Sequence, residues 1–175
     1  AMILAGQQPK GVALARATGS PAHVVTDAGH AAGPRLRDFA AFNDPNASPS
    51  ALLVECGEHF SPTSEDVALD VAIRFLMETK TLAAVPRGVI KSTKTPTQKY
   101  IDVTEAVTIR SEKFAFARKF RCFETIPKAA TIIGHDGVVP VVTPYDNCIL
   151  VMPATHFAPG QTAVRLGRHI PWPNA

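Results

Sequence analysis

Ala51-Leu52-Leu53-Val54-Glu55-Cys56-Gly57-Glu58-His59 places a carboxylate directly after a short run of apolar residues. A short, continuous apolar run that ends before a glycine predicts a β-strand buried on both faces of a sheet. In open α/β sheets, the carboxyl ends of the strands open onto the ligand crevice. An ionised carboxylate is costly to bury alone, so Glu55 is expected to meet a cation, a strong donor or a proton-transfer partner. Glu55 is therefore the first candidate for a catalytic residue.

An amphipathic helix is predicted directly after this stretch. Thr63 fits its N-cap, and apolar residues recur at helical spacing from Val67 onward. On the opposite, solvated stripe, Asp70 is placed to pair with Arg74 one turn later. Strand, loop and helix in this order form half of a βαβ unit.

The hydrophobic pattern changes class along the chain. A helix is predicted from Pro9 to Ala17, a strand over residues 22–26, and a loop with short pieces of structure up to residue 50. Beyond Tyr100, short β-type runs alternate with turn signals. The predicted fold class is α/β followed by all-β. Residues 1–81 form the α/β part, 82–99 a linker, and 100–175 a small all-β domain of barrel or sandwich type.

Composition narrows the function classes. With 175 residues, 46% hydrophobic and 19% charged, the chain can bury one sizeable core or two small ones. The net charge of +3 comes from scattered lysines and arginines, so nucleic acid is not an expected partner. No apolar run is long enough to cross a bilayer and no secretory signal is recognisable, which predicts a soluble cytoplasmic protein without a membrane partner.

Three cysteines, Cys56, Cys122 and Cys148, lack the paired spacing of a disulfide framework or a zinc knuckle. They are predicted to be buried, reduced thiols. The chain also begins in apolar sequence without a helix cap or a lead-in, which predicts that it starts inside a fold.

Four segments together resemble the succinylglutamate desuccinylase/aspartoacylase family of zinc hydrolases. They are Asp27-Ala28-Gly29-His30-Ala31-Ala32-Gly33, Leu53-Val54-Glu55-Cys56-Gly57-Glu58-His59, Val103-Thr104-Glu105-Ala106-Val107 and Thr143-Pro144-Tyr145-Asp146. Family members look like a zinc-carboxypeptidase fold followed by a β domain, and they hydrolyse the amide of N-acyl amino acids. The resemblance implies that the chain is the C-terminal portion of such a protein, that its substrate is a small N-acyl amino acid, and that Glu55 is the general base.

The zinc ligands of this family come from a His-x-x-Glu motif and a further histidine, all before the region matched here. This sequence has no His-x-x-Glu motif, and its six histidines are spread singly. The resemblance therefore implies zinc as the cofactor of the parent enzyme, with ligands upstream and none in this chain. We expect the chain to be inactive alone.

Five further residues are candidates for substrate contacts. A planar guanidinium of Arg35 or Arg37 would hold a substrate carboxylate through two hydrogen bonds, and the resemblance favours Arg37. His59 follows the Glu55 strand, His30 lies in a glycine-flanked loop, and Tyr145 lies in a turn of the β domain. For each of them a structural role stays open: an arginine in a surface ion pair, a hydrogen-bonded histidine or a packing tyrosine.

Three functional hypotheses remain. The first is part of a zinc-dependent amidohydrolase with Glu55 as its base, against which stands a structural Glu55 paired with Arg35 or Arg37. The second is a non-catalytic binding or oligomerisation module, in which the β domain makes a homo-oligomer contact. The third is a metal-independent thiol hydrolase that uses Cys56, although no group that would orient the thiol is recognisable.

Overall fold

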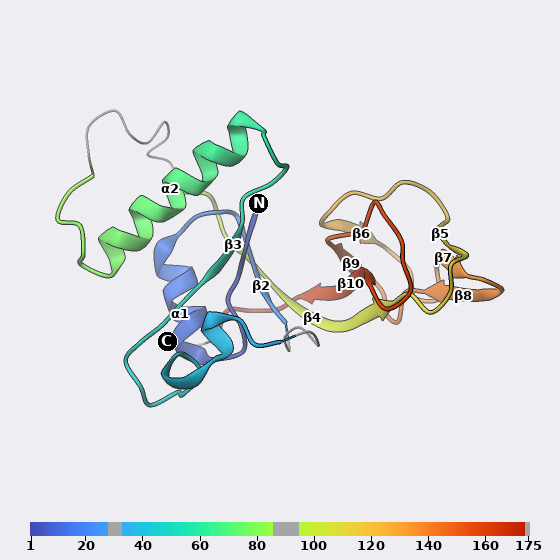
Figure 1. Ribbon diagram of the computed structural model, residues 1–175, viewed down its shortest axis with the longest axis horizontal. Coiled ribbons are helices and arrows are strands. Elements are labelled where there is room, and N and C mark those ends of the chain that lie inside the picture. Colours follow the sequence, from blue (N-terminus) through green and yellow to red (C-terminus); the bar gives the residue numbers. More distant parts are fainter. Residues whose placement is uncertain (28–32, 86–94, 174–175) are drawn as a thin grey trace. The chain divides into compact units, whose positions relative to one another are not determined.

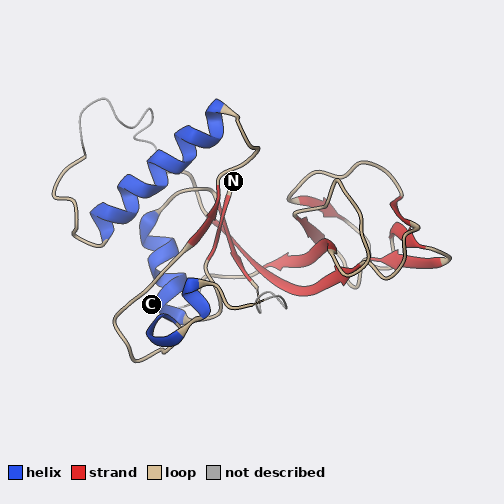
Figure 2. Ribbon diagram, in the orientation of Figure 1, coloured by secondary structure: helices blue, strands red, loops and turns tan. Residues whose placement is uncertain are grey.

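The computed structural model describes residues 1–27, 33–85 and 95–173. The chain divides into two compact units, one of Ala1–Ile101 with Pro171–Ala175 and the other of Asp102–Ile170. Among the described residues, both α-helices lie in the first unit, and the second unit is built of strands (Figure 2). The predicted change from helices and strands to strands alone is therefore confirmed. The exact boundaries of the domains and linker stay a prediction.

The first unit begins with a βαβ element (Figure 1). Strand β1 (Met2–Leu4), helix α1 (Pro9–Thr18) and strand β2 (His23–Thr26) follow one another, and the two strands pair in parallel. The helix begins with a proline, which lacks the N–H that a first turn leaves unpaired, and it ends at Gly19 in the left-handed region (φ 74°). The helix and the strand predicted in this part are confirmed.

Strand β3 (Leu53–Glu55) corrects the prediction made from its apolar sequence. It pairs antiparallel with β1 and lies at the edge of the sheet, in the order β3-β1-β2. All three of its residues are only half-buried. An antiparallel neighbour needs no crossover helix, so the chain after β2 can return on the outer side of β1. Glu55 consequently lies opposite Met2, at the amino end of β1, and not at the carboxyl end of a parallel strand.

Helix α2 (Pro62–Glu78) follows β3, as predicted, but begins two residues earlier than expected. Ser61 is its N-cap residue, and Thr63 lies inside the first turn. Val71 and Ile73 are its buried residues. No helix in residues 1–27, 33–85 or 95–173 combines the length and apolar character that a membrane span requires.

The two helices of the first unit are joined through Asp70. Arg74 Nε donates to Asp70 Oδ1 at 2.8 Å, which confirms the predicted pair. Ser20 Oγ, just after α1, donates to Asp70 Oδ2 at 2.6 Å. The stripe of α2 that the sequence predicts to be solvated is therefore half-buried at Asp70 and Arg74, because the end of α1 packs there.

Residues after Ile170 return to the first unit. The Trp172 ring stacks on Tyr100, with 4.8 Å between ring centroids. The guanidinium carbon of Arg16, on α1, lies 5.4 Å from the centroid of the Trp172 ring, which is within the range of a cation–π contact.

Strand β4 (Lys99–Thr108) begins in the first unit, where Lys99 N donates to Ala22 O at 2.7 Å, and continues into the second. The second unit contains two sheets, with strand orders β4-β10-β9-β6 and β5-β7-β8. Its other strands are β5 (Phe114–Phe116), β6 (Glu124–Ile126), β7 (Ile132–Asp136), β8 (Val139–Val142), β9 (Cys148–Val151) and β10 (Thr162–His169).

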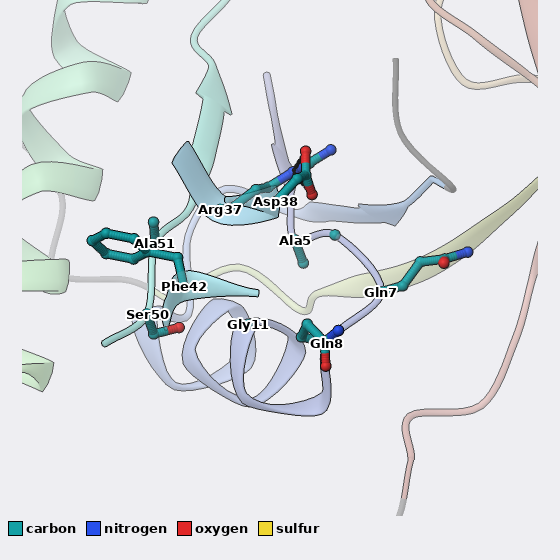
Figure 3. A pocket seen from close by; sticks show the side chains of 10 residues that line it. Ala5, Gln7, Gln8, Gly11, Arg37, Asp38, Phe42, Ser50 and Ala51 are labelled. Carbon is teal, nitrogen blue, oxygen red and sulfur yellow. Dashed lines mark hydrogen bonds and ion pairs between the residues drawn. The ribbon is translucent and has the colours of Figure 1, made fainter. Parts of the chain in front are cut away.

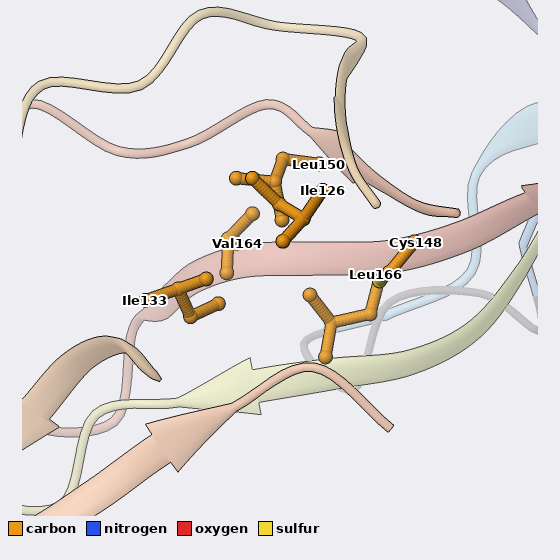
Figure 4. Packing of buried hydrophobic residues seen from close by; sticks show 6 residues of the cluster. All are labelled: Ile126, Ile133, Cys148, Leu150, Val164 and Leu166. Atoms are coloured by element: carbon orange, nitrogen blue, oxygen red, sulfur yellow. The ribbon is translucent and has the colours of Figure 1, made fainter. Parts of the chain in front are cut away.

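The core of the second unit is a cluster of apolar side chains from these strands (Figure 4). It consists of Ile126, Ile133, Cys148, Leu150, Val164 and Leu166.

The tight turn between β7 and β8 passes through Gly137, which takes the left-handed conformation (φ 64°) that such two-residue loops require. The short strand β5 was not predicted, since three residues are too few to show a period.

Candidate active site

Glu55 is the last residue of β3, and its side chain is half-buried. In the described part of the chain, no hydrogen bond or ion pair involves its carboxylate. The structural pairing with Arg35 or Arg37 is therefore not observed. Because carboxylates are costly to hold near apolar surface without a partner, Glu55 is left available to a group that this part of the chain does not provide.

A constrained turn connects Glu55 to helix α2. Gly57 has a φ of 131°, and a Cβ atom at this position would lie 2.6 Å from Ser64 Oγ. Ser64 Oγ in turn donates to the carbonyl oxygen of Glu58 at 2.8 Å. Only glycine fits this close approach without strain, so the first turn of α2 fixes the position of the strand end that carries Glu55.

Arg37 belongs to a short 3-10 turn, η1 (Leu36–Asp38), and is only 5% exposed. Its Nη1 atom donates to the carbonyl oxygen of Leu4, and its Nε atom lies 3.3 Å from Asp38 Oδ1. The Nη2 atom is buried and has no hydrogen-bond partner among the described residues. Arg37 thus ties η1 to the end of β1, and a contact between Arg37 and a substrate stays a prediction.

A small cavity lies beside Arg37 (Figure 3). Its volume is about 10 Å³, roughly the room that one water molecule needs. It is lined by Ala5, Gly6, Gln7, Gln8, Gly11, Arg37, Asp38, Phe42, Ser50 and Ala51. A whole amino acid substrate does not fit into this space.

Arg35 is half-buried and precedes η1. Its carbonyl oxygen accepts from Asp38 N at 2.9 Å, and no ion pair of its guanidinium is found in residues 1–27, 33–85 or 95–173. Its predicted contact with a substrate carboxylate is not tested by this geometry.

Of the two histidine candidates, only His59 lies within the described residues. His59 is exposed in the connection between β3 and α2, with its ring centroid 6.2 Å from that of the exposed Phe60. His30 lies outside the described residues. A role for either one toward a substrate stays a prediction.

Tyr145 belongs to the second unit, where its ring packs against the core cluster. Its hydroxyl lies 2.7 Å from Thr104 Oγ1. Thr104 donates its own proton to the carbonyl oxygen of Leu166 at 3.2 Å, so Tyr145 is the donor in this pair. Burial raises the pKa of Tyr145 and keeps the phenol protonated. Packing and this hydrogen bond hold Tyr145 within the second unit, and its predicted contact with a substrate stays a prediction.

The cysteines are free, but only Cys148 is fully buried; Cys56 is half-buried and Cys122 exposed, which corrects the prediction that all three are buried. The pKa of Cys56 is raised, first by burial and then by the charge of Glu55. A raised pKa lowers the fraction of thiolate, which is the nucleophilic form. The environment of Cys56 therefore argues against the thiol-hydrolase hypothesis.

Metal ligands do not come together in the described ranges: no group of three or more His, Cys, Asp and Glu side chains that could hold a metal ion is found there. These residues therefore do not fit a zinc site by themselves.

Sequence reasoning missed an apolar groove between β3 and α2. Its volume is about 460 Å³, within the size range of ligand pockets. It is lined by Leu36, Phe42, Ser50, Ala51, Leu52, Val54, Cys56, Ala68, Val71, Ala72 and Phe75. Glu55 is not among these residues, since neighbouring side chains of a strand point to opposite faces. The apolar run from 51 to 54 is the sequence signal of this groove, but the same run also fits a strand buried on both faces.

Comparisons with known proteins show which solved structures share this fold. No protein-family model matches the chain, and a search of curated proteins finds no relative. The crystal structure of succinylglutamate desuccinylase from Vibrio cholerae aligns with a TM-score of 0.63 and 17% identity, covering 96% of this chain and 48% of that one. The chain has the fold of half a succinylglutamate desuccinylase. The X-ray structure of the Vibrio parahaemolyticus desuccinylase gives a TM-score of 0.59 and 19% identity, covering 97% of this chain and 48% of that one.

The likeness to desuccinylases that the resemblance implies is confirmed at the level of the fold, and the chain spans about half the length of the desuccinylase structures it matches. This share is consistent with the predicted C-terminal part. The zinc-carboxypeptidase-like character of the α/β part stays a prediction. At identities below 20%, the desuccinylase likeness establishes the fold, and the activity needs its own test.

Proposed function

We propose that this chain is part of a hydrolase that cleaves the amide of N-acyl amino acids, with Glu55 as its general base. The observation that carries the proposal is the half-buried carboxylate at the end of β3, free of partners in the described residues, on a desuccinylase fold. The resemblance of residues 53–59 to the catalytic segment of the family supports the same role. We propose as well that the α/β part has a zinc-carboxypeptidase-like fold.

The proposed chemistry is a proton relay through one carboxylate. Glu55 accepts a proton from a water molecule as the water oxygen attacks the amide carbonyl carbon. When the C–N bond breaks, the same carboxyl group gives the proton to the departing amine nitrogen. Both steps need a carboxyl group that is not tied up in an ion pair.

Zinc, where bound, lowers the pKa of a water molecule toward neutrality and so supplies a nucleophile. The described residues do not fit a zinc site, so we propose that its ligands lie outside this chain. The chain alone is then expected to be inactive, and Arg37, Arg35, His59, His30 and Tyr145 are at most auxiliary to Glu55.

The decisive experiment measures amine release from a panel of N-acyl amino acids, beginning with N-succinylglutamate and N-acetylaspartate. The protein is this chain extended upstream through the expected zinc ligands. Glu55→Gln is expected to lower kcat by roughly 10²- to 10⁴-fold, the usual contribution of a general base. Glu58→Gln, at the exposed carboxylate three residues later, is the matched control and should retain activity. Equal rates in wild type and Glu55→Gln would remove Glu55 from the mechanism.

A non-catalytic assembly module remains the second candidate. The observation that favours it is the exposed apolar surface of β8 and its turn, where Val138 is 95% and Val139 60% exposed. Under this alternative, the second unit forms a homo-oligomer in the absence of any activity, which sedimentation over a range of concentrations would detect.

A further inference from the structure

The segment of residues 41–49 in the first unit turns several backbone carbonyl groups toward one point. Four of these oxygens lie 2.7–2.9 Å from the Nζ atom of Lys10 on α1. They belong to Ala41, Asp44, Ala47 and Pro49. We call these four oxygens the carbonyl cage. Carbonyl groups that converge on a common centre are the ligands with which proteins bind a dehydrated cation.

The carbonyl cage carries no formal negative charge. All four of its oxygens belong to neutral peptide groups, and no ion pair of Lys10 is found in the described part of the chain. The one carboxylate of residues 41–49 is that of Asp44, which accepts from the backbone N–H of Asn46 at 2.9 Å. Sites for Mg²⁺ and Ca²⁺ are built around carboxylates. A neutral set of oxygens therefore favours a monovalent cation.

The size of the carbonyl cage points to the same class of ion. Mg²⁺ binds oxygen at about 2.0–2.1 Å and Ca²⁺ at about 2.3–2.6 Å. Both are too small for four oxygens that lie 2.7–2.9 Å from a common centre. Potassium is similar in size to an ammonium group, and carbonyl oxygens replace its hydration shell in channel filters. The cage thus has the size that potassium requires.

Lys10 fills the carbonyl cage with an imperfect match. An ammonium group has three N–H donors, so four acceptors must share them, whereas a spherical ion attracts all four oxygens equally. Lys10 also lies in the first turn of α1, where a positive charge opposes the helix dipole. The cage therefore holds a cation at a position that the helix itself disfavours.

We propose that the carbonyl cage is a binding site for a monovalent cation, in which the Lys10 ammonium takes the place of a potassium ion. The tethered ammonium excludes potassium from the wild-type protein. Potassium enters when the ammonium is removed, and it then holds residues 41–49 as Lys10 does. This inference rests on the geometry of the first unit and not on the proposed hydrolysis.

Lys10→Ala empties the carbonyl cage and keeps a good helix former in α1. Unfolding of this variant by urea is compared in potassium chloride and in choline chloride, whose cation is too large for the cage. An ion that binds only the folded state at about ten times its Kd lowers the equilibrium constant of unfolding about tenfold, and we expect this change from potassium. Ammonium chloride should act in the same way as potassium chloride.

Two further chains serve as controls for general salt effects. The wild-type protein should show the same stability in potassium and in choline, because its own ammonium occupies the carbonyl cage. Lys10→Met should gain less from potassium than Lys10→Ala, since the terminal methyl group of methionine reaches close to the position of Nζ. A salt effect on the rest of the protein would appear equally in all three chains.

Occupancy of the carbonyl cage can also be measured in the wild-type protein. Reductive methylation of amines, followed by mass spectrometry, should modify Lys10 about tenfold more slowly than the exposed Lys80, because the Lys10 ammonium reacts only after the segment opens locally. In urea, where the chain is unfolded, the two lysines should react at equal rates.

Three results would overturn the proposal. The first is an equal stability of Lys10→Ala in potassium and in choline, including a variant that stays unfolded in both salts. The second is an equal gain from potassium in wild type and in Lys10→Ala. The third is an equal rate of methylation of Lys10 and Lys80 in the folded wild-type protein.

Discussion

The Nζ atom of Lys10 lies 2.7 Å from the carbonyl oxygen of Pro49. The carbonyl oxygens of Ala41, Asp44 and Ala47 lie 2.8, 2.7 and 2.9 Å from the same Nζ atom, so its three N–H donors are shared among four acceptors. One side chain on the first turn of α1 thus binds the backbone of residues 41–49, the segment that leads into β3. All four contacts are made to carbonyl oxygens of the backbone, and none to a carboxylate.

Lys10→Met should loosen this segment. It keeps the length of the aliphatic stem and removes the charged donors, and hydrogen bonds to charged groups are individually worth about 1.5–3 kcal/mol. Since most of these contacts are exposed, we expect a total loss of about 1–3 kcal/mol in the free energy of unfolding by urea. Lys80→Met, at an exposed lysine after α2, should change it by less than about 0.5 kcal/mol. Equal losses in the two variants would contradict the role of Lys10.

Gly57→Ala should destabilise the turn between β3 and α2. An alanine there has an unfavourable φ of 131°, and its Cβ would also meet Ser64 Oγ at 2.6 Å. Gly33→Ala is the matched control, because Gly33 has a φ of 136° but no described atom within 4 Å of such a Cβ. Strain at such backbone positions costs about 1–3 kcal/mol. Thermal unfolding should show a clearly larger loss at Gly57 than at Gly33; the reverse order would show that the Ser64 contact is unimportant.

Glu55→Gln should lower the pKa of Cys56. Burial is the main cause of the raised pKa and remains in the variant, but the negative charge that adds to it is removed. The thiol should therefore alkylate faster at a given pH near neutrality, with the midpoint of its rate profile shifted to lower pH. Glu58→Gln serves as the control. An unchanged profile in Glu55→Gln would mean that the carboxylate is not charged beside Cys56.

Acid should weaken the second unit through Asp136. Its carboxylate accepts from the Ser111 hydroxyl and from the backbone N–H groups of Arg110 and Ser111, at 2.6 and 3.0 Å for the two N–H groups. These bonds, the Ser111 hydroxyl first, hold the pKa of Asp136 below its usual value. A lowered pKa in the folded state gives stability that is present above about pH 4 and is lost as the pH falls through the folded value.

Urea titrations between pH 7 and pH 2 test this linkage. Asp136→Asn and Ser111→Ala should both show a smaller loss of stability in acid than wild type, since each removes part of the bonding to the charged form. Slopes as steep as that of wild type in both variants would assign the acid sensitivity to other carboxylates.

The sequence was most informative where the pattern was long or the residue type was specific. Helix α2 and the Asp70–Arg74 pair follow from helical spacing, helix α1 follows from the proline at its start, and the turn at Gly137 follows from its residue type. The resemblance implied a likeness to desuccinylases, and structural alignments with TM-scores of 0.59 and 0.63 now support it at the level of the fold. Such signals are local, or they rest on several short motifs in a fixed order.

Strand β3 shows why other features could not be predicted. An apolar run of a few residues has the same composition in a doubly covered strand and in an edge strand beside an open groove. Which of the two forms depends on the neighbour it pairs with, and the pairing of Leu53 with Leu4 is a long-range choice with no local signal. The environment of Arg37 is also non-local, since its partner is a carbonyl on β1.

The stack of Trp172 on Tyr100 sets an order on biosynthesis. The first unit contains residues that precede the second unit in the sequence and residues that follow it. Its contact between Trp172 and Tyr100 therefore forms only after residues 102–170 have been translated. Trp172 is the single tryptophan of the chain. A ribosome stalled before residue 171 would carry a first unit that lacks this contact. In a chain that includes Trp172, the fluorescence of its one indole would report when the ring stacks on Tyr100.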